Sequence, residues 1–214
     1  MTRNKINIAF VIPSLDRGGV SSAAVSLINK LEDTIYNKFM ILYDGTVNDY
    51  KPECEMIDLR TPKRNCKILK IISQIKRHSR LKRIKKEKDI DISISFKDNP
   101  NLASLFSKQN DRIIMTVHTT PSRDYKGIKG KIYKYLIGKY FERADRIVTV
   151  SEGIKNDLIL NYSLNKDKIE TIYNFVDTGM INILALEPVE DELKALFGDG
   201  QTVITVGRLS EAKG

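Results

Sequence analysis

The last residues of the chain combine a glycine with two cations directly after an apolar run. Val203–Val206 has the composition of a buried strand, and Gly207, Arg208 and Lys213 follow it. The planar guanidinium of Arg208 can bind two phosphate oxygens at once, and Lys213 adds a point charge. The spacing therefore predicts a diphosphate site, against the simpler interpretation of a surface turn with two solvated cations.

A second glycine element follows the first apolar run of the chain, Ile6–Ile12. Gly18 and Gly19 lie between Asp16 and Ser21, just before a helical pattern. Adjacent glycines allow close approach of a ligand, and a helix starting near Ser21 would direct free N–H groups at an anion. The simpler interpretation is a turn in which Ser21 caps the helix. The spacing matches neither GxGxxG nor a P-loop, which disfavours both of those nucleotide sites.

His118 is the best imidazole candidate for chemistry. The chain has two histidines, and the other, His78, lies in a strongly basic segment. His118 and Thr119 follow the apolar run Ile113–Val117 directly. A histidine there can bind a sugar hydroxyl or stabilise developing charge, and the alternative is a structural or exposed loop histidine.

Further polar side chains come directly after other apolar runs. Because ligands of parallel sheets bind beyond the carboxyl ends of the strands, these residues are candidates to line a substrate cleft together with Asp16, Ser21 and Thr119. Helix capping and local turns are the competing interpretations, above all for Ser151, Asn174 and Asp177. The additional candidates are Asn99, Asn101, Ser151, Asn174 and Asp177.

Positioning these residues requires a sheet of buried strands. Apolar runs alternate with helical patterns, which predicts βαβ units and a Rossmann-like, doubly wound, mostly parallel sheet of the α/β class. The expected strands are Ile6–Ile12, Phe39–Tyr43, Met56–Leu59, Ile92–Phe96, Ile113–Val117, Ile147–Val150, Ile169–Ile172 and Val203–Val206. The expected helices are Ser21–Leu31, Asn101–Phe106, Ile128–Phe141, Glu152–Asn161 and Glu190–Leu196.

The 214 residues fit one domain and the beginning of another. We expect a first domain over 1–175, a linker with a short helix over 176–200, and the start of a truncated second domain over 201–214. Cys54 and Cys66 form no zinc or disulfide pattern, so a reducing cytoplasm is the expected location. No apolar run approaches the roughly 18 residues of a membrane span.

The net charge of +9 is concentrated in one segment. Residues 63–88 hold twelve Lys and Arg and one acid, Glu87. One helical face carries Ile68, Ile71, Ile72 and Ile75, and roughly the opposite face carries Leu81 and Ile84. This pattern predicts two short helices with a break near Arg77–Arg80. Two solvated helices or adhesion to an anionic membrane would each account for the segment, and the absence of aromatic residues disfavours nucleic acid. The expected membrane-facing residues are Arg80, Lys82, Arg83, Lys85 and Lys86.

Taken together, the motifs resemble glycosyltransferase family 4 of the GT-B fold. The resemblance runs almost end to end and rests on order and spacing. Besides the two glycines it includes SFKDNPNLASL at 95–105, VHTTP at 117–121, VTVSEGIKNDL at 148–158, IYNFVD at 172–177 and VGRLSEAKG at 206–214.

The resemblance implies a retaining transferase that moves a hexose-type sugar from a nucleotide-diphosphate sugar, expected to be a UDP-sugar, without metal or other cofactor. Gly18, Gly19, Arg208 and Lys213 would bind the donor diphosphate, and His118 would contact the donor sugar. The acceptor would be a lipid-linked or surface glycan, reached by an enzyme peripheral to the inner face of the cell membrane.

Two departures from the family pattern limit this expectation. Many members carry glutamate where this chain has Ser21, and the acidic E-x7-E segment of the second domain would lie past Gly214. We therefore expect the 214-residue chain to be inactive alone. The alternatives are a non-catalytic sugar- or membrane-binding module and a GT-B-like nucleotide-sugar epimerase.

Overall fold

The computed structural model describes residues 5–61, 67–124, 126–176, 178–194 and 203–204. The chain divides into two units, Met1–Phe175 and Val176–Gly214, each described by itself below.

The first unit is built on a seven-stranded, entirely parallel sheet in the order β3-β2-β1-β4-β5-β6-β7. Its central strands are buried on both faces, which is why they read as continuous apolar runs. The predicted α/β, doubly wound architecture is confirmed. The strands are β1 (Ile6–Ile12), β2 (Tyr36–Leu42), β3 (Glu55–Asp58), β4 (Ile92–Phe96), β5 (Arg112–Val117), β6 (Arg146–Thr149) and β7 (Ile169–Thr171).

Strand pairing extends β2 beyond its apolar run. The expected strand began at Phe39, whereas β2 begins at Tyr36, because Tyr36 pairs with Ile6 and the ladder then runs without interruption to Ile12 and Leu42. Backbone groups beside a complete partner strand are satisfied best by continuing the ladder, whatever side chain they carry.

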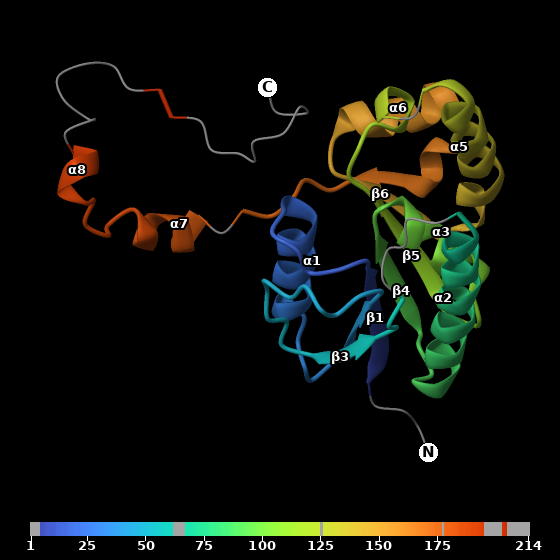
Figure 1. The fold of residues 1–214 in the computed structure, drawn as a ribbon, viewed down its shortest axis with the longest axis horizontal. Helices are drawn as coiled ribbons and strands as arrows, with labels where there is room; N and C mark the ends of the chain where they lie inside the picture. The colour runs from blue at the N-terminus through green and yellow to red at the C-terminus, as the bar shows by residue number, and fades with distance from the viewer. Residues whose placement is uncertain (1–4, 62–66, 125, 177, 195–202, 205–214) are drawn as a thin grey trace. The chain divides into compact units, whose positions relative to one another are not determined.

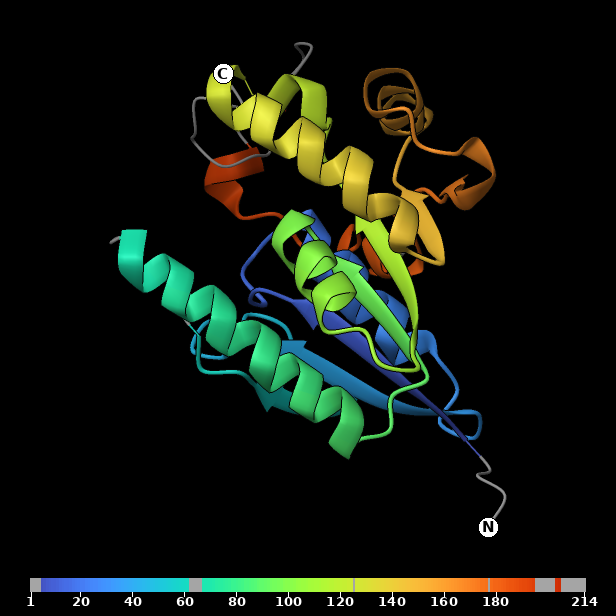
Figure 2. The same ribbon diagram turned by 90° about the vertical axis from the view of Figure 1, so that its right-hand side faces the viewer.

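Helices cover both faces of this sheet (Figures 1 and 2). Helix α1 packs Ala24, Val25 and Ile28 against β1 and β2 on one face, while α2 and α3 lie on the other. The helices of this unit are α1 (Gly19–Lys30), α2 (Lys67–Glu87), α3 (Asp98–Phe106), α4 (Pro121–Asp124), α5 (Gly127–Tyr140) and α6 (Glu152–Tyr162), with 3-10 turns at Phe141–Arg143 and Lys166–Lys168.

The basic segment forms one continuous helix, so the predicted break near Arg77–Arg80 is wrong. The sheet-facing side of α2 carries Arg77, Leu81, Ile84 and Lys85, all buried and all on one helical stripe. Two of these four are cations, so a pattern of apolar residues alone does not reveal the stripe. Long cationic side chains can bury their stems when their ends find polar partners.

The second unit contains α7 (Thr178–Leu184) and α8 (Asp191–Lys194). The expected helix Glu190–Leu196 corresponds to α8, and α7 was not expected. Val203 and Ile204 are described and lie outside any strand, while the rest of the expected strand Val203–Val206 lies outside the described residues.

Candidate functional site

A cavity of about 330 Å³ lies where the strand order reverses direction. The chain runs from β1 outward to β2 and β3, and then returns to β4 on the other side of β1. At such a switch point the loops after the two central strands diverge and leave room for a ligand. The cavity lining comes from the loops after β1, β4 and β5 and from the helices that follow these strands. It includes Lys97, Asp98, Asn99, His118, Thr119 and Asp124.

His118 lies in this cavity with one ring nitrogen engaged and the other unpaired. The hydroxyl of Thr116 donates to the Ser95 carbonyl at 2.9 Å and lies 2.9 Å from Nε2 of His118. Since a threonine hydroxyl has a single proton, Thr116 must accept from His118, which places the imidazole proton on Nε2. The other nitrogen, Nδ1, is buried without a partner among the described residues and is a hydrogen-bond acceptor.

Burial keeps this imidazole neutral. It lowers the pKa of His118 from 6.5 to about 4, and the charge of Lys97 adds to the effect. A neutral ring with a lone pair on Nδ1 can accept a hydrogen bond from a sugar hydroxyl. It supplies no positive charge near pH 7, so of the two roles expected for His118, hydroxyl binding fits this geometry and stabilisation of negative charge does not.

Asn101 holds the loops of the cavity together from beneath. Its side chain accepts from the Ser95 hydroxyl at 2.7 Å and donates to the Thr116 carbonyl at 3.0 Å, and the residue is fully buried. The prediction that Asn101 lines the cleft is wrong, because both ends of its amide are used inside the protein. Asn101 instead fixes β4 against β5 next to His118.

Ser21 likewise supports the site from within. It is 1% exposed, and its hydroxyl lies 3.3 Å from both the Ser14 carbonyl and the Asp16 carboxylate. The prediction that Ser21 contacts substrate is therefore wrong in this structure. Asp16 is half-buried, and it also accepts from the Ser14 hydroxyl and lies 3.8 Å from the ammonium of Lys97.

Gly18 and Gly19 open helix α1 without a capping side chain. The backbone of Gly18 is extended, with φ 169°, so glycine is not required there for its conformation. A Cβ added at either position would meet nothing within 4 Å, so the space beside both residues is open. Their expected contact with a diphosphate stays a prediction.

Lys97 is the site residue that the sequence pattern did not single out. It follows β4 directly, lines the cavity and has φ 76° and ψ 162°. This region of backbone space is occupied almost only by glycine, and such strain is concentrated at functional sites. Its position, one residue beyond the end of an apolar strand, was the available signal.

The remaining candidates lie in different surroundings. Asn99 and Thr119 are exposed and line the cavity, and Ser151 caps α6 by accepting from the Ile154 amide at 3.3 Å. Asn174 is exposed. Asp177, Arg208 and Lys213 lie outside the described residues, and their expected roles stay predictions.

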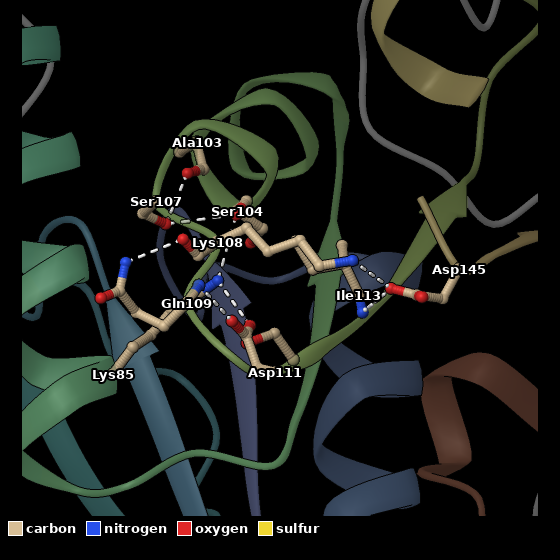
Figure 3. Close-up of polar contacts among 10 residues, drawn as sticks. Lys85, Ala103, Ser104, Ser107, Lys108, Gln109, Asp111, Ile113 and Asp145 are labelled. Atoms are coloured by element: carbon tan, nitrogen blue, oxygen red, sulfur yellow. Dashed lines mark hydrogen bonds and ion pairs between the residues drawn. The ribbon is translucent and has the colours of Figure 1, made fainter. Parts of the chain in front are cut away.

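Lys85 faces the interior, so its expected exposure to a membrane is wrong. Its ammonium lies 2.8 Å from Asp111 and donates to the Ser104 carbonyl at 3.1 Å, as Figure 3 shows. Both charged side chains are fully buried. Burial lowers the pKa of Lys85, and Asp111 partly offsets this effect.

The other residues expected at a membrane differ in exposure. The guanidinium of Arg80 donates to the carbonyls of Leu59 and Arg60. Lys82, Arg83 and Lys86 are exposed, and Arg83 pairs with Glu87 at 3.4 Å. Among the described residues, none of the helices has the length and apolarity to cross a bilayer, and no cluster of three or more metal-ligating side chains occurs.

Fold and cavity together define a Rossmann-like domain that offers a ligand site at its switch point. The chain matches the model of Glycosyltransferase Family 4 over residues 17–179. It is 28% identical over 213 residues to the N-acetylgalactosamine-N,N'-diacetylbacillosaminyl-diphospho-undecaprenol 4-alpha-N-acetylgalactosaminyltransferase of Campylobacter jejuni, covering 96% of this chain and 56% of that relative.

Solved structures share the fold. A glycosyltransferase from Rickettsia africae matches with a TM-score of 0.67 and 22% identity, over 91% of this chain and 49% of its own. HepE of Anabaena, solved with UDP and glucose, matches with a TM-score of 0.59 and 10% identity, over 89% and 50%. The chain belongs to glycosyltransferase family 4, has the fold of the N-terminal half of GT-B enzymes, and spans about half the length of these proteins.

Proposed function

We propose that this chain is the acceptor-side half of a retaining glycosyltransferase that moves a hexose-type sugar from a nucleotide-diphosphate donor. The observation that carries the proposal is the switch-point cavity of a chain of this family, which His118 lines together with other polar residues. Nδ1 of His118 is buried without a partner among the described residues. The open space beside Gly18 and Gly19 supports an approach of the donor diphosphate to α1.

Some residues of the site would orient the donor sugar, and others would neutralise the charge of the diphosphate. His118 would accept a hydrogen bond from a donor-sugar hydroxyl, and the buried contacts of Asn101 and Thr116 would hold its ring in place. Arg208 and Lys213 would neutralise the diphosphate leaving group as its charge develops.

The first donor to test is a UDP-linked N-acetylhexosamine. The Campylobacter jejuni relative is named as an N-acetylgalactosaminyltransferase acting on a diphospho-undecaprenol-linked glycan. That name supports N-acetylgalactosamine as the sugar and a lipid-linked glycan as the acceptor. A UDP-linked donor and a place in surface-glycan synthesis are further parts of our proposal.

The experiment compares UDP release by the 214-residue chain with release by a longer protein that joins this chain to a nucleotide-binding second half. We expect acceptor-dependent release and an α-configured product, read by NMR, only from the longer protein. Robust transfer by the 214-residue chain would contradict the proposal that transfer requires the nucleotide-binding second half. Conversion of the donor without any acceptor would favour a nucleotide-sugar epimerase.

We also propose that the protein acts at the cytoplasmic face of an anionic membrane. Helix α5 exposes Ile128, Ile132 and Tyr135 on one helical face. Residues 126–140 contain five lysines and no acid. Figure 2 shows α5 and α2 on the same side of the sheet, where the exposed Lys82 and Lys86 add positive charge. An apolar strip flanked by cations suits a lipid headgroup layer.

Vesicle co-sedimentation tests this surface. Replacing Lys131 and Lys134 by glutamate should weaken binding to phosphatidylglycerol vesicles by about tenfold or more, since each basic residue contributes about 1 kcal/mol at such a surface. The matched control replaces Lys51 and Lys166, exposed lysines outside α2 and α5, with the same net change of charge. Equal losses in the two variants would contradict a localised membrane surface.

A further inference from the structure

The sheet ends at β3, whose outer edge is open. β3 pairs with β2 on one side, and none of the other described strands lies on its second side. Met56 in this strand is 45% exposed. An edge strand presents unpaired N–H and C=O groups, which are a template for pairing with another chain. The edge of β3 is therefore a place where a second polypeptide can add a strand.

A groove of about 460 Å³ follows this edge, between β3 and α2. Its apolar lining consists of Ile57, Leu59 and Ile84, and every other residue that lines it is charged. Leu59 and Ile84 are buried and belong to the core beneath the groove. An apolar strip bordered by charges is typical of the centre and rim of a protein interface.

The charged residues of the groove differ between the two ends of β3. At the carboxyl end, the guanidinium of Arg80 donates to the Arg60 carbonyl at 3.3 Å, which brings these two arginines together. At the amino end, the ammonium of Lys88 lies 2.6 Å from the carboxylate of Glu55, and Glu87 precedes Lys88 in α2. Two arginines therefore mark one end, and two glutamates with one lysine mark the other.

The pairing of these groups leaves opposite charge unused at the two ends. At the carboxyl end, Asp58 is the acid that lines the groove, so the two arginines leave an excess of one positive charge. At the amino end, Glu87 pairs with Arg83 at 3.4 Å, which compensates the second glutamate. Glu53, exposed directly before β3, adds a further negative charge there. Each end thus has an excess that the other end could neutralise.

We propose that β3 forms the contact of a symmetric dimer, in which a second copy of this chain adds its own β3 antiparallel to the first. Two-fold symmetry then places the amino end of each β3 beside the carboxyl end of the other, so acids face arginines at both ends of the contact. A parallel arrangement would set the arginines of the two copies against each other. The proposal goes beyond the transferase assignment and does not depend on it.

The same symmetry determines which faces of the two copies agree. The two-fold axis of an antiparallel edge pair is perpendicular to the sheet, so both copies direct the same face to the same side. Because α2 and α5 lie on one side of the sheet (Figure 2), the basic helices of both copies would lie on one side of the dimer. The surface that we propose for a membrane would therefore be present twice on that side.

Charge reversal at the two ends of β3 tests the dimer. In sedimentation velocity, the mass of the 214-residue chain should approach twice its 24.4 kDa as the concentration rises. Glu55→Arg and Arg60→Glu should each weaken the dimer by at least about tenfold, since symmetry places two like-charge contacts in each variant homodimer. A chain that stays monomeric at millimolar concentration, or a dimer that both variants leave intact, would overturn the proposal.

Mixing the two variants gives the sharper result. One variant has cations at both ends of β3 and the other has acids at both ends, so a dimer of one with the other regains opposite charges at both contacts. We expect the equimolar mixture to dimerise about as strongly as the unaltered chain. The double variant Glu55→Arg/Arg60→Glu should also dimerise, since its two ends exchange sign together. A mixture that stays monomeric would contradict the antiparallel pairing.

Matched controls lie at the opposite end of the sheet. Glu170→Arg and Lys166→Glu reverse exposed charges in β7 and in the turn before it. Both should leave the dissociation constant of the dimer unchanged, and circular dichroism should show every variant folded. If these controls abolish the dimer while the β3 variants keep it, the contact lies at β7 and the proposal is wrong.

Discussion

Two lysine–aspartate pairs lie at opposite edges of the same sheet and differ in almost every physical respect. At the amino edge, beside the start of β4, Lys85 and Asp111 are 2.8 Å apart and fully buried. At the carboxyl edge, just beyond β4, Lys97 and Asp16 are 3.8 Å apart with side chains 39% and 43% exposed.

The amino-edge pair is saturated by other protein groups. Asp111 accepts from the Ser93 hydroxyl at 2.6 Å and the Gln109 amide at 2.8 Å, and Lys85 also donates to Ser104 (Figure 3). The carboxyl-edge pair is longer and partly exposed, and His118, whose Nδ1 is buried without a partner among the described residues, lines the cavity beside it. The same chemical pair therefore fixes the fold at one edge and leaves groups available to a ligand at the other.

The largest test of this contrast is Lys85→Ala. It leaves the buried carboxylate of Asp111 uncompensated, and we expect a loss of about 3–5 kcal/mol of unfolding free energy in urea titrations. Lys86→Ala, at the exposed neighbouring position, should change stability by less than about 0.5 kcal/mol. Similar values for the two variants would remove the distinction between a saturated pair and surface charge.

The second test uses pH at the carboxyl edge. The pKa of His118 is about 4 in the folded protein against 6.5 when unconstrained, so the unfolded chain binds an additional proton between these values. Stability should therefore fall as pH decreases from about 6.5 to 4, by at most about 3 kcal/mol from this residue. His118→Asn should flatten that part of the stability curve. An unchanged slope would mean that the imidazole is protonated in the folded state.

Thr116→Val tests the support beneath the site. The substitution leaves the Ser95 carbonyl and the Nε2 proton of His118 without their partner, and we expect a cost of about 1–3 kcal/mol. Thr116→Ser keeps the hydroxyl and should recover most of this loss. Equal destabilisation by serine and valine would assign the effect to the lost methyl group instead.

The smallest expected effect is a gain in stability, whereas the preceding substitutions are expected to lower it. Lys97→Gly relieves backbone strain of about 1–3 kcal/mol and adds a glycine entropy cost of about 0.5–1 kcal/mol, so we expect a net gain of about 1 kcal/mol. Thermal unfolding measures it, with Lys97→Ala, which keeps the strain and removes the charge, as the control. A loss of stability on substitution by glycine would mean that the ion pair with Asp16 matters for folding.

Local patterns predicted the elements well where strands are continuous and apolar. β1 and β4 have the expected bounds, and β5, β6 and β7 differ by single residues at their ends. Burial on both faces favours mostly apolar runs, so this part of the fold can be predicted from local sequence. In β4 the buried Ser93 and Ser95 interrupt the apolar run and donate to Asp111 and Asn101. Polar side chains that follow predicted strands likewise indicated Asn99, His118 and Thr119 as cleft residues. All three line one cavity.

What the sequence determined by itself is thus the sheet, its parallel direction and the end of the strands at which the cavity lies. The tertiary structure alone decided which polar residues line the cavity and which face the core. Lys85 and Asp111 are 26 residues apart, and Asn101 and Thr116 are 15 apart, so their pairing depends on how distant elements pack. A charged or amide side chain is buried only when such a partner is present, and no local pattern supplies that information.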